Sequence, residues 1–553
     1  MKQVVTTEKV PIKMWLDDIE EGALQEAKNL ANLPFAFHHI AVMPDSHQSN
    51  HGMPIGGVLA TKGVVIPFAV GVDISCGMCA VKTSLTYIDT EVLKKIMGEI
   101  RKVIPLGMNH HKEKQDESLM PFKGTSVCSI MPIVESQYNK ALYSLGSLGG
   151  GNHFLEIQKG SDGYIWIMIH SGSRNLGKQV CDYYNKIAEE LNTRWHSSVS
   201  KDWKLAFLPI DSEEGQAYLR EMNYCVEFAF ANRKLMMDRT MEIFKNLKNM
   251  YPSLIDISFE PMINITHNYA RMESYCEDCI DNQDNDNPIV EYLSGVEAVS
   301  KVQDFLNGYR PVVHSCGGLI LSNATSFLKI SPLQVDVLEQ MSDACRSLNL
   351  GLELKHNHLK TSLHLCGCED LGSFDESYYS SLNKFGLGFS HLFGVEKDFR
   401  KWDRILGRIF LGYEAYNLDC KLNNNTSSIS HKHNPTQVMV HRKGATLASV
   451  GTIGIIPGSM GTKSYIVKGL GNPDSYNSCS HGAGRKMGRK DACRRLNLEE
   501  EQRKMEGIVH GMRTQNDLEE APGSYKNIET VMENQKDLVE VLVELTPLAS
   551  IKG

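Results

Sequence analysis

The sequence predicts an α+β protein that is interrupted by a separate inserted domain. Short runs of β-branched and aromatic residues between glycines and serines indicate buried strands. Apolar residues at helical spacing indicate amphipathic helices. A long middle segment differs from both flanks, because the glycine-rich polar turns of the flanks thin out there. We therefore expect one catalytic body assembled from the two flanks, with an α/β domain between them.

The first expected element is a short amphipathic helix at 16–33, whose apolar face comprises Leu16, Ile19, Ala23, Ala27 and Leu30. Strands are expected at 64–70 (VVIPFAV) and 164–170 (YIWIMIH). A long helix follows at 215–246, and Asp211 and Glu214 are spaced as a capping pair ahead of it. Strands that end in polar, glycine-rich turns return after the middle segment, which favours one body built from distant parts of the chain.

The inserted block begins near the run DNQDNDNP and ends near LNNNTSSISHKHN, and both runs are typical of exposed linkers. Within it, Ser331 and Pro332 open a predicted helix that Gly351 closes. The expected domains are 1–274 as the first part of the body, 275–432 as the insertion, and 433–553 as the second part of the body.

Length, charge and composition argue against several classes of protein. A chain of 553 residues is too long for one ordinary core. The formal net charge of −8 argues against a surface that binds nucleic acid by bulk electrostatics, although a local basic groove stays compatible with it. The N-terminus lacks an apolar signal core and no apolar stretch approaches 18 residues, so we expect a cytoplasmic protein without a membrane segment. Without a secretory signal, the 14 cysteines are expected to be thiols or metal ligands.

Four short motifs place metal-binding side chains at strand ends or in polar turns. GVDISCGM carries Asp73 and Cys76, GGGNHF carries His153, IMIHSGSR carries His170, and NITHNYA carries His267. Three imidazoles, one thiolate and one carboxylate suit Mn²⁺, Zn²⁺, Co²⁺ or Fe²⁺ better than Mg²⁺ or Ca²⁺. Such a cation would neutralise phosphate charge and orient an in-line attack.

Two further motifs consist mostly of small residues. NSCSHGAGR surrounds His481 with Ser, Gly and Ala, and PGSMG is followed by Ser464. Small residues let backbone amides approach a ligand closely. Together with Arg485, these turns are expected to bind the phosphates of a nucleotide.

These motifs resemble those of the RtcB-type RNA ligases, the tRNA-splicing 3'-phosphate ligases. The resemblance rests on MPDSH, GMPIGGV, GVDISCGM, LGGGNHF, HSGSR, HNYA, HRKGAT, GIIPGSMGTKSYIV, SCSHGAGRKMGR, EAPGSYKNI and the closing IKG, which occur in family order. It covers residues from about 40 to 274 and from 433 to 553. It implies a catalytic body of mixed β-sheets flanked by helices.

The resemblance implies that His481 is the nucleophile that attacks the α-phosphate of GTP and becomes a histidine-guanylate. The guanylate would pass to an RNA 3'-phosphate, giving a 3'-pp-5'-G end, and the 5'-hydroxyl of a second RNA would displace GMP. A 2',3'-cyclic phosphate would first be opened. Two Mn²⁺ ions would be held by Asp73, Cys76, His153, His170 and His267.

The implied GTP contacts lie in the same motifs and comprise Asn152, Glu156, Asn268, Pro457, Gly458, Ser459, Met460, Ser464, Gly482, Ala483, Gly484, Arg485 and Lys552. Arg174 would contact RNA. The implied partners are GTP, RNA with the ends named above, and an archease-like activator.

The sequence departs from the family pattern in three places. The segment QSNHG after His47 is about one residue longer than the usual turn. Thr266 occupies a position where many relatives carry a second histidine. Third, about 158 residues (275–432) stand between HNYA and HRKGAT, which nearly adjoin in the family.

The insertion admits three interpretations. Cys276 and Cys279 together with His364, Cys366 and Cys368 would form a zinc site, or they are ordinary thiols. A decayed element of the intein type is the third, but Pro435 follows Asn434 where splicing requires Cys, Ser or Thr, so the block is expected to stay in the mature chain.

Because the block enters near His267, an alternative function is a Mn²⁺-dependent RNA-end capping enzyme or cyclic phosphodiesterase with impaired ligation. An RNA-binding relic without activity is a third hypothesis, which the retained His481 and ligand set oppose.

Overall fold

The computed structural model describes residues 1–121, 131–250, 257–275 and 436–553, and four short strands between 312 and 366. Side chains are described for the first four ranges, except at 248–250. The chain divides into two compact units: residues 1–123, 127–284 and 433–553 form the first, and residues 124–126 and 285–432 the second. No helix in the described ranges combines the length and apolar composition needed to cross a membrane.

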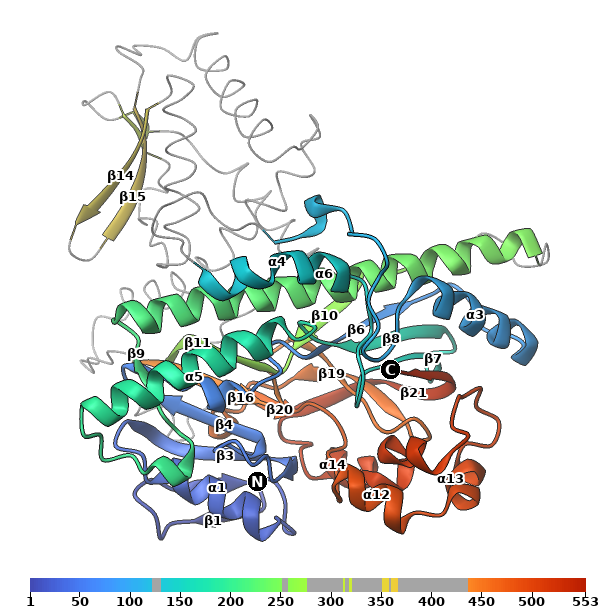
Figure 1. Ribbon diagram of the computed structural model, residues 1–553, viewed down its shortest axis with the longest axis horizontal. Coiled ribbons are helices and arrows are strands. Elements are labelled where there is room, and N and C mark those ends of the chain that lie inside the picture. The colour runs from blue at the N-terminus through green and yellow to red at the C-terminus, as the bar shows by residue number, and fades with distance from the viewer. Residues whose placement is uncertain are drawn as a thin grey trace, which may run out of the picture. The chain divides into compact units, whose positions relative to one another are not determined.

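The first unit contains two large sheets, which lie side by side in Figure 1. Sheet one has the order β1 (Gln3–Val5), β2 (Ile12–Met14), β3 (Ala36–His47), β4 (Ile55–Thr61), β16 (Thr436–Lys443) and β11 (Asn268–Tyr275). It is mixed, because β2 pairs with β3 in parallel. Sheet two is antiparallel, with the order β10 (Ile263–Thr266), β6 (Gly77–Lys82), β8 (Ile165–Ser171), β7 (Phe154–Gly160), β21 (Val539–Lys552), β19 (Ser464–Gly469) and β18 (Ile453–Ile456). Two small ladders join β5 (Val64–Val65) to β9 (Leu208–Pro209) and β17 (Ala445–Leu447) to β20 (Ser478–Ser480).

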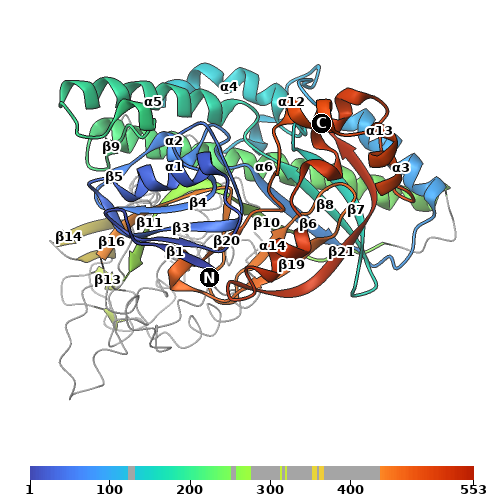
Figure 2. The same ribbon diagram turned by 90° about the horizontal axis from the view of Figure 1, so that it is seen from below.

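Helices flank the sheets, as expected for an α+β fold. Figure 2 shows α4 (Pro132–Ser144), α5 (Leu176–Arg194) and α6 (Glu213–Met250) along one side of both sheets. The other α-helices in the described ranges are α1 (Glu21–Ala31), α2 (Pro67–Val70), α3 (Thr90–Val103), α12 (Arg489–Arg495), α13 (Leu498–Lys504) and α14 (Ile528–Glu533). Apolar clusters fill the contacts of α1 with sheet one and of α3 and α6 with sheet two. The predicted fold class is confirmed for this unit.

Local expectations were met unevenly. The strand at 164–170 is confirmed as β8, and the long helix is confirmed as α6. The N-cap of α6 is the Ser212 hydroxyl, which accepts from the Gly215 amide, and not the predicted pair Asp211 and Glu214. The strand expected at 64–70 is wrong beyond Val65, because Pro67 starts the short helix α2. Proline favours the first helical turn, where its missing N–H costs nothing. The opening helix is shorter than expected and begins at Glu21.

The described strands on either side of residues 276–435 pair as a β-hairpin ladder. Strands β11 and β16 pair along their full length, from Asn268 opposite Lys443 to Tyr275 opposite Thr436. The chain therefore leaves the body roughly 24 Å along the strand from Asn268, at about 3.4 Å per residue. Tyr275 and Thr436, the described residues on either side of the insertion, are paired in this ladder. The ladder can therefore form whatever sequence connects them.

The described part of the second unit is one antiparallel sheet in the order β12 (Val312–Val313), β13 (Gly318–Ile320), β15 (Lys360–Cys366) and β14 (Gly351–Asn357). Gly351 begins β14; the helix predicted ahead of it lies outside the described residues. Cys276, Cys279 and Cys368 lie outside them too, and no side chain of the proposed zinc set is described. The domain boundaries at 275 and 432 stay a prediction.

The hairpin geometry predicts that the insertion is dispensable for folding of the body. Replacing residues 276–435 by Asn-Gly would join Tyr275 to Thr436 through a two-residue turn that suits an antiparallel ladder. We expect the shortened chain to be monodisperse and to unfold cooperatively, measured by circular dichroism during heating. An aggregated or molten product would contradict this prediction.

A buried ion pair holds the same hairpin. The guanidinium of Arg442 on β16 donates to both carboxylate oxygens of Glu273 on β11, and both side chains are nearly inaccessible. Burial alone would raise the pKa of Glu273, but the charges of Arg271 and Arg442 lower it to about 2. The pair is therefore charged throughout the physiological range.

Glu273→Gln should lower the free energy of unfolding by about 3–5 kcal/mol at pH 7, because it leaves the Arg442 charge buried without a counterion. Glu273 stabilises the fold above its unfolded pKa near 4.5 and loses this effect as the pH falls through about 2. The difference in unfolding free energy between wild type and Glu273→Gln, measured by urea unfolding, should become smaller as the pH falls from 5 to 3. The matched control Glu540→Gln removes only an exposed pairing with Lys468 and should change little.

Candidate active site

A cavity of about 630 Å³ opens between the two sheets and has a volume typical of small-ligand sites. Sheet one contributes His47, Ile55, Asn268 and Lys443 to its wall, and sheet two contributes Phe154, His170 and Lys552. The turns at 48–51, 457–460 and 481–485 complete the wall. Segments that are hundreds of residues apart in the sequence thus surround one cavity.

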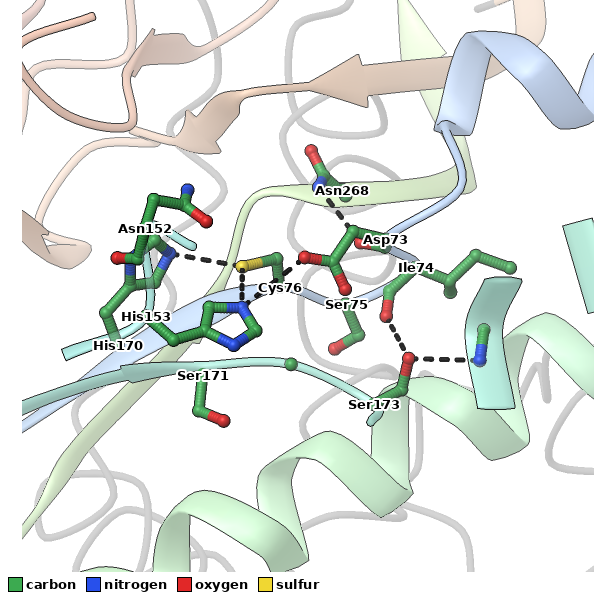
Figure 3. A network of polar contacts seen from close by, with 12 residues as sticks. Asp73, Ile74, Ser75, Cys76, Asn152, His153, His170, Ser171, Ser173 and Asn268 are labelled. Atoms are coloured by element: carbon green, nitrogen blue, oxygen red, sulfur yellow. Dashed lines mark hydrogen bonds and ion pairs between the residues drawn. The ribbon is translucent and has the colours of Figure 1, made fainter. Parts of the chain in front are cut away.

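The five predicted metal ligands come together at this cavity. Cys76 lies centrally, with its Sγ 3.1 Å from His170 Nε2 and 3.3 Å from His153 Nε2, as Figure 3 shows. His170 Nε2 is 3.4 Å from His267 Nε2, and His153 Nε2 is 3.5 Å from an oxygen of Asp73. The donor atoms form two groups within 4.8 Å, Cys76 with His170 and His267, and Cys76 with Asp73 and His153. Cys76 belongs to both groups.

The electrostatics of the cluster favour a bound cation. Burial lowers the pKa of His170 and His267 well below its usual value, so both rings are neutral. The Nδ1–H of His170 donates to the Asn152 carbonyl at 3.0 Å, which leaves the lone pair of Nε2 directed at Cys76. Burial and the neighbouring Asp73 raise the pKa of the Cys76 thiol. The lone pairs of these donor atoms therefore point at one another with little positive charge to balance them. A bound divalent ion would relieve the repulsion between them.

Backbone contacts hold the turn that carries Asp73 and Cys76. Ser75 adopts a left-handed conformation with φ of 60°, and its amide donates to the Asn268 carbonyl at 2.8 Å. The Asn268 side chain donates to the Asp73 carbonyl at 2.9 Å and accepts from the Gly444 amide at 2.7 Å. Thr266, the second of the three departures from the family pattern expected from the sequence, donates to the Cys76 carbonyl at 3.2 Å. This departure from the family pattern thus supports the turn.

His481 follows β20 and is held by a carboxylate that sequence reasoning missed. Asp45, fully buried on β3, accepts from the His481 amide at 3.1 Å and from its Nδ1 at 2.5 Å through the same oxygen. Since Nδ1 carries the proton, Nε2 bears the lone pair. The rings of His481 and His267 have centroids 4.8 Å apart, so the free nitrogen belongs to a ring beside the donor cluster. Asp45 lay within the quoted motif MPDSH, but no local pattern links it to His481.

Most of the predicted GTP contacts line the cavity. Besides His481, the lining includes Asn152, Asn268, Pro457, Gly458, Ser459, Met460, Gly482, Ala483, Gly484, Arg485 and Lys552. Glu156 and Ser464 lie behind the wall, where Gln158 donates to both of them at 2.8 and 3.2 Å. Ser464 in turn accepts from the Gly458 amide at 3.2 Å and so supports the PGSMG turn.

One end of the cavity combines charge with aromatic rings. Burial raises the pKa of Glu156 to about 7, and the charge of Lys552 opposes this effect. Lys552 Nζ lies 5.1 Å from the centroid of the Phe154 ring. Glu520 accepts from Arg485 at 3.1 Å and from Arg489 at 2.9 Å. Tyr525 also lines this end and donates to Glu520. Sequence reasoning assigned no role to Glu520, Arg489 or Tyr525.

Arg174 does not line the cavity. Its Nε donates to the Ser147 hydroxyl and its Nη2 to the Gly107 carbonyl, both at 3.0 Å. These bonds brace the loop ahead of the triple glycine. A contact with RNA stays a prediction for this residue.

A donor cluster beside an imidazole held by a carboxylate, in a cavity of nucleotide size, suits an enzyme that transfers phosphoryl or nucleotidyl groups. The family model described as tRNA-splicing ligase RtcB matches residues 26–128, 124–284 and 404–553. The chain belongs to the RtcB family.

Named relatives agree with this assignment. The chain is 29% identical to the RNA-splicing ligase RtcB1 of Escherichia coli strain ATCC 25922, and 28% identical to the RNA-splicing ligase RtcB of strain K12. Both alignments cover 100% of this chain and 99% of the relative. The tRNA-splicing ligase RtcB of Thermococcus kodakarensis is 30% identical over 48% of this chain and 65% of its own length.

The shared position of Cys76 predicts that its loss weakens both donor groups. Cys76→Ala should reduce Mn²⁺ binding by at least about 10²-fold, since even loss of a supporting contact costs 10- to 100-fold at metal sites. The measurement is equilibrium dialysis of the full chain with elemental analysis. Cys493→Ser, a half-exposed thiol outside the cluster, is the control. Equal Mn²⁺ binding by both variants would show that the cluster is no metal site.

Proposed function

We propose that this protein is a GTP- and Mn²⁺-dependent RNA ligase that joins RNA 3'-phosphate or 2',3'-cyclic phosphate ends to 5'-hydroxyl ends. The observation that carries the proposal is the His481–Asp45 pair beside the donor cluster, in one cavity. The names of the relatives, RNA-splicing and tRNA-splicing ligase, support RNA as the substrate.

In the first step, Nε2 of His481 attacks the α-phosphorus of GTP, an N–P bond forms and pyrophosphate leaves. Asp45 keeps the proton on Nδ1 and stabilises the positive charge that develops on the ring. The small residues 482–484 line the cavity and leave room for in-line approach. The product is a histidine-guanylate.

An oxygen of the RNA 3'-phosphate then attacks the guanylate phosphorus, frees His481 and forms a 3'-pp-5'-G end. The 5'-hydroxyl of the second RNA attacks the RNA-side phosphorus, loses its proton and releases GMP. A cyclic phosphate is opened by water beforehand. Splitting the condensation in this way gives each displacement a good leaving group.

The residues present fit a divalent metal centre, because three imidazoles, a thiol and a carboxylate converge there. We propose that the two donor groups, both of which include Cys76, would hold two Mn²⁺ ions. Bound there, the ions would neutralise phosphate charge and polarise the attacked P–O bonds. Asp73, Cys76, His153, His170 and His267 are the proposed ligands.

The guanosine is proposed to lie at the end of the cavity that Phe154, Arg485, Tyr525 and Lys552 line. Two aromatic rings and two cationic side chains are available to it there. The other predicted contacts act from the turns around His481 or, for Glu156 and Ser464, from behind the wall. An archease-like activator and a cytoplasmic location stay expectations from the sequence.

The capping or phosphodiesterase alternative was motivated by an insertion next to His267. The chain instead leaves the body at Tyr275, at the far end of β11. No contact among the described residues favours impaired ligation.

The proposal predicts covalent labelling of His481. With Mn²⁺ and α-labelled GTP, the full chain should acquire acid-labile label, and His481→Ala should acquire none. Asp45→Asn should label roughly 10²- to 10⁴-fold more slowly, because the tautomer is no longer fixed. His196→Asn, an exposed histidine outside the cavity, is the matched control.

Persistent labelling of His481→Ala would refute the assigned nucleophile, and wild-type rates in Asp45→Asn would refute the orienting role. Adding 3'-phosphate and 5'-hydroxyl RNAs should convert the label into free GMP and joined RNA. Capped ends that accumulate without joined RNA would favour the alternative. If wild type stays unlabelled even with an archease-like protein, the proposed function fails.

A further inference from the structure

The longer turn after His47 forms part of the wall of the active-site cavity. Gln48, Ser49, Asn50 and His51 all line it, on the side of sheet one. Lys552 and Phe154, at the proposed guanosine end, belong to sheet two. The turn is therefore available to a second ligand in the same cavity.

Buried charges fix this turn rigidly. The Ser49 hydroxyl donates to Glu26 at 3.1 Å and accepts from the ammonium of Lys443 at 3.1 Å. The Ser49 amide donates to the other Glu26 oxygen at 3.0 Å, and Lys443 also donates to the His51 carbonyl at 3.2 Å. Glu26 and Lys443 are both buried, and Lys443 further donates to Phe68. All three donor hydrogens of Lys443 are thus used within the protein, and its charge serves the turn.

Asn50 and His51 each present one side-chain atom without a partner in the described part of the chain. His51 donates from Nδ1 to the Ser49 carbonyl at 3.0 Å and packs edge-on against the Phe68 ring, so its Nε2 is a fixed acceptor. The Asn50 carboxamide accepts from Gln48 at 3.2 Å, which leaves its NH₂ as a donor. Neither His51 Nε2 nor Asn50 Nδ2 has a partner among the described residues. Asn50 holds a left-handed conformation, φ 62°, in which asparagine is tolerated.

We propose that the turn 48–51 reads the ribose of an RNA end, with His51 Nε2 and Asn50 Nδ2 binding its 2'-hydroxyl. A hydroxyl donates one hydrogen bond and accepts another, which matches one free acceptor and one free donor on adjacent residues of the same cavity wall. Neither group is a guanidinium or an ammonium, the side chains that usually bind phosphate, so the pair suits a sugar better than a phosphate. The 2'-hydroxyl is also the group by which proteins distinguish RNA from DNA. This inference rests on the proposed ligase function, and it assigns the turn to RNA specificity.

The test compares three substrate pairs in ligation by the full chain with GTP and Mn²⁺. One pair is all ribose, one carries a single 2'-deoxynucleotide at the 3'-phosphate end, and one carries it at the 5'-hydroxyl end. The wild type should prefer ribose at one of the two ends by about tenfold in kcat/KM, as expected for one or two hydrogen bonds. The preferred end identifies the strand that is read.

In His51→Ala this preference should fall to less than about twofold, whereas His51→Gln, which retains an acceptor, should keep part of it. Asn50→Gly, which tolerates the left-handed backbone, should reduce it as well. His196→Asn should retain the wild-type preference. Asn50→Gly decides the question if His51→Ala fails to fold by circular dichroism.

The inference is overturned if wild type shows no ribose preference at either end, or if His51→Ala and Asn50→Gly keep it. It is also overturned if His51→Ala slows labelling by GTP alone as much as it slows ligation, because the turn would then serve the guanylate. Absence of His481 labelling in wild type would instead reject the ligase function itself.

Discussion

A single buried carboxylate, that of Asp45, joins the two halves of the active site. It lies on β3 and accepts two hydrogen bonds from His481, which follows it by 436 residues. A buried charge without partners is costly, so this contact fixes the segment after β20 against sheet one. Gly484 packs so closely on the Asp45 carbonyl that a Cβ there would lie 2.1 Å from its oxygen. The position of the His481 ring beside the donor cluster depends on this arrangement.

The donor cluster imposes the second constraint. Its side chains come from the turn before β6, the residue before β7, the end of β8 and the junction of β10 and β11. Burial lowers the pKa of His170 and His267, whose rings converge with the other donors of the cluster, and a cation offsets the cost of gathering these donors. The Asn152 carbonyl accepts from His170 Nδ1 and the Asn268 carboxamide donates to the Asp73 carbonyl, so both residues brace the ligands.

The fold accommodates a long insertion because the insertion joins two residues that are already paired. The β11–β16 ladder and the Arg442–Glu273 pair complete sheet one up to Tyr275. Closing a longer loop costs little additional entropy, since the cost grows only with the logarithm of its length. The turn 48–51 is held differently, because the side chains of buried Glu26 and Lys443 bond to it at the cavity.

The sequence by itself determined the α+β class, β8, the long helix α6 and the chemical identity of the metal donors. These features depend on short-range periodicity and on side-chain chemistry, which a sequence displays directly. Family motifs supplied His481 and the guanylate contacts, most of which face the cavity. Only the tertiary structure decided that Pro67 starts a helix, that Asp45 holds His481, that Arg174 and Glu156 lie off the cavity wall, and that the insertion leaves from a hairpin end. Each of these depends on partners far away in the chain, and long-range contacts leave no periodic trace in the sequence.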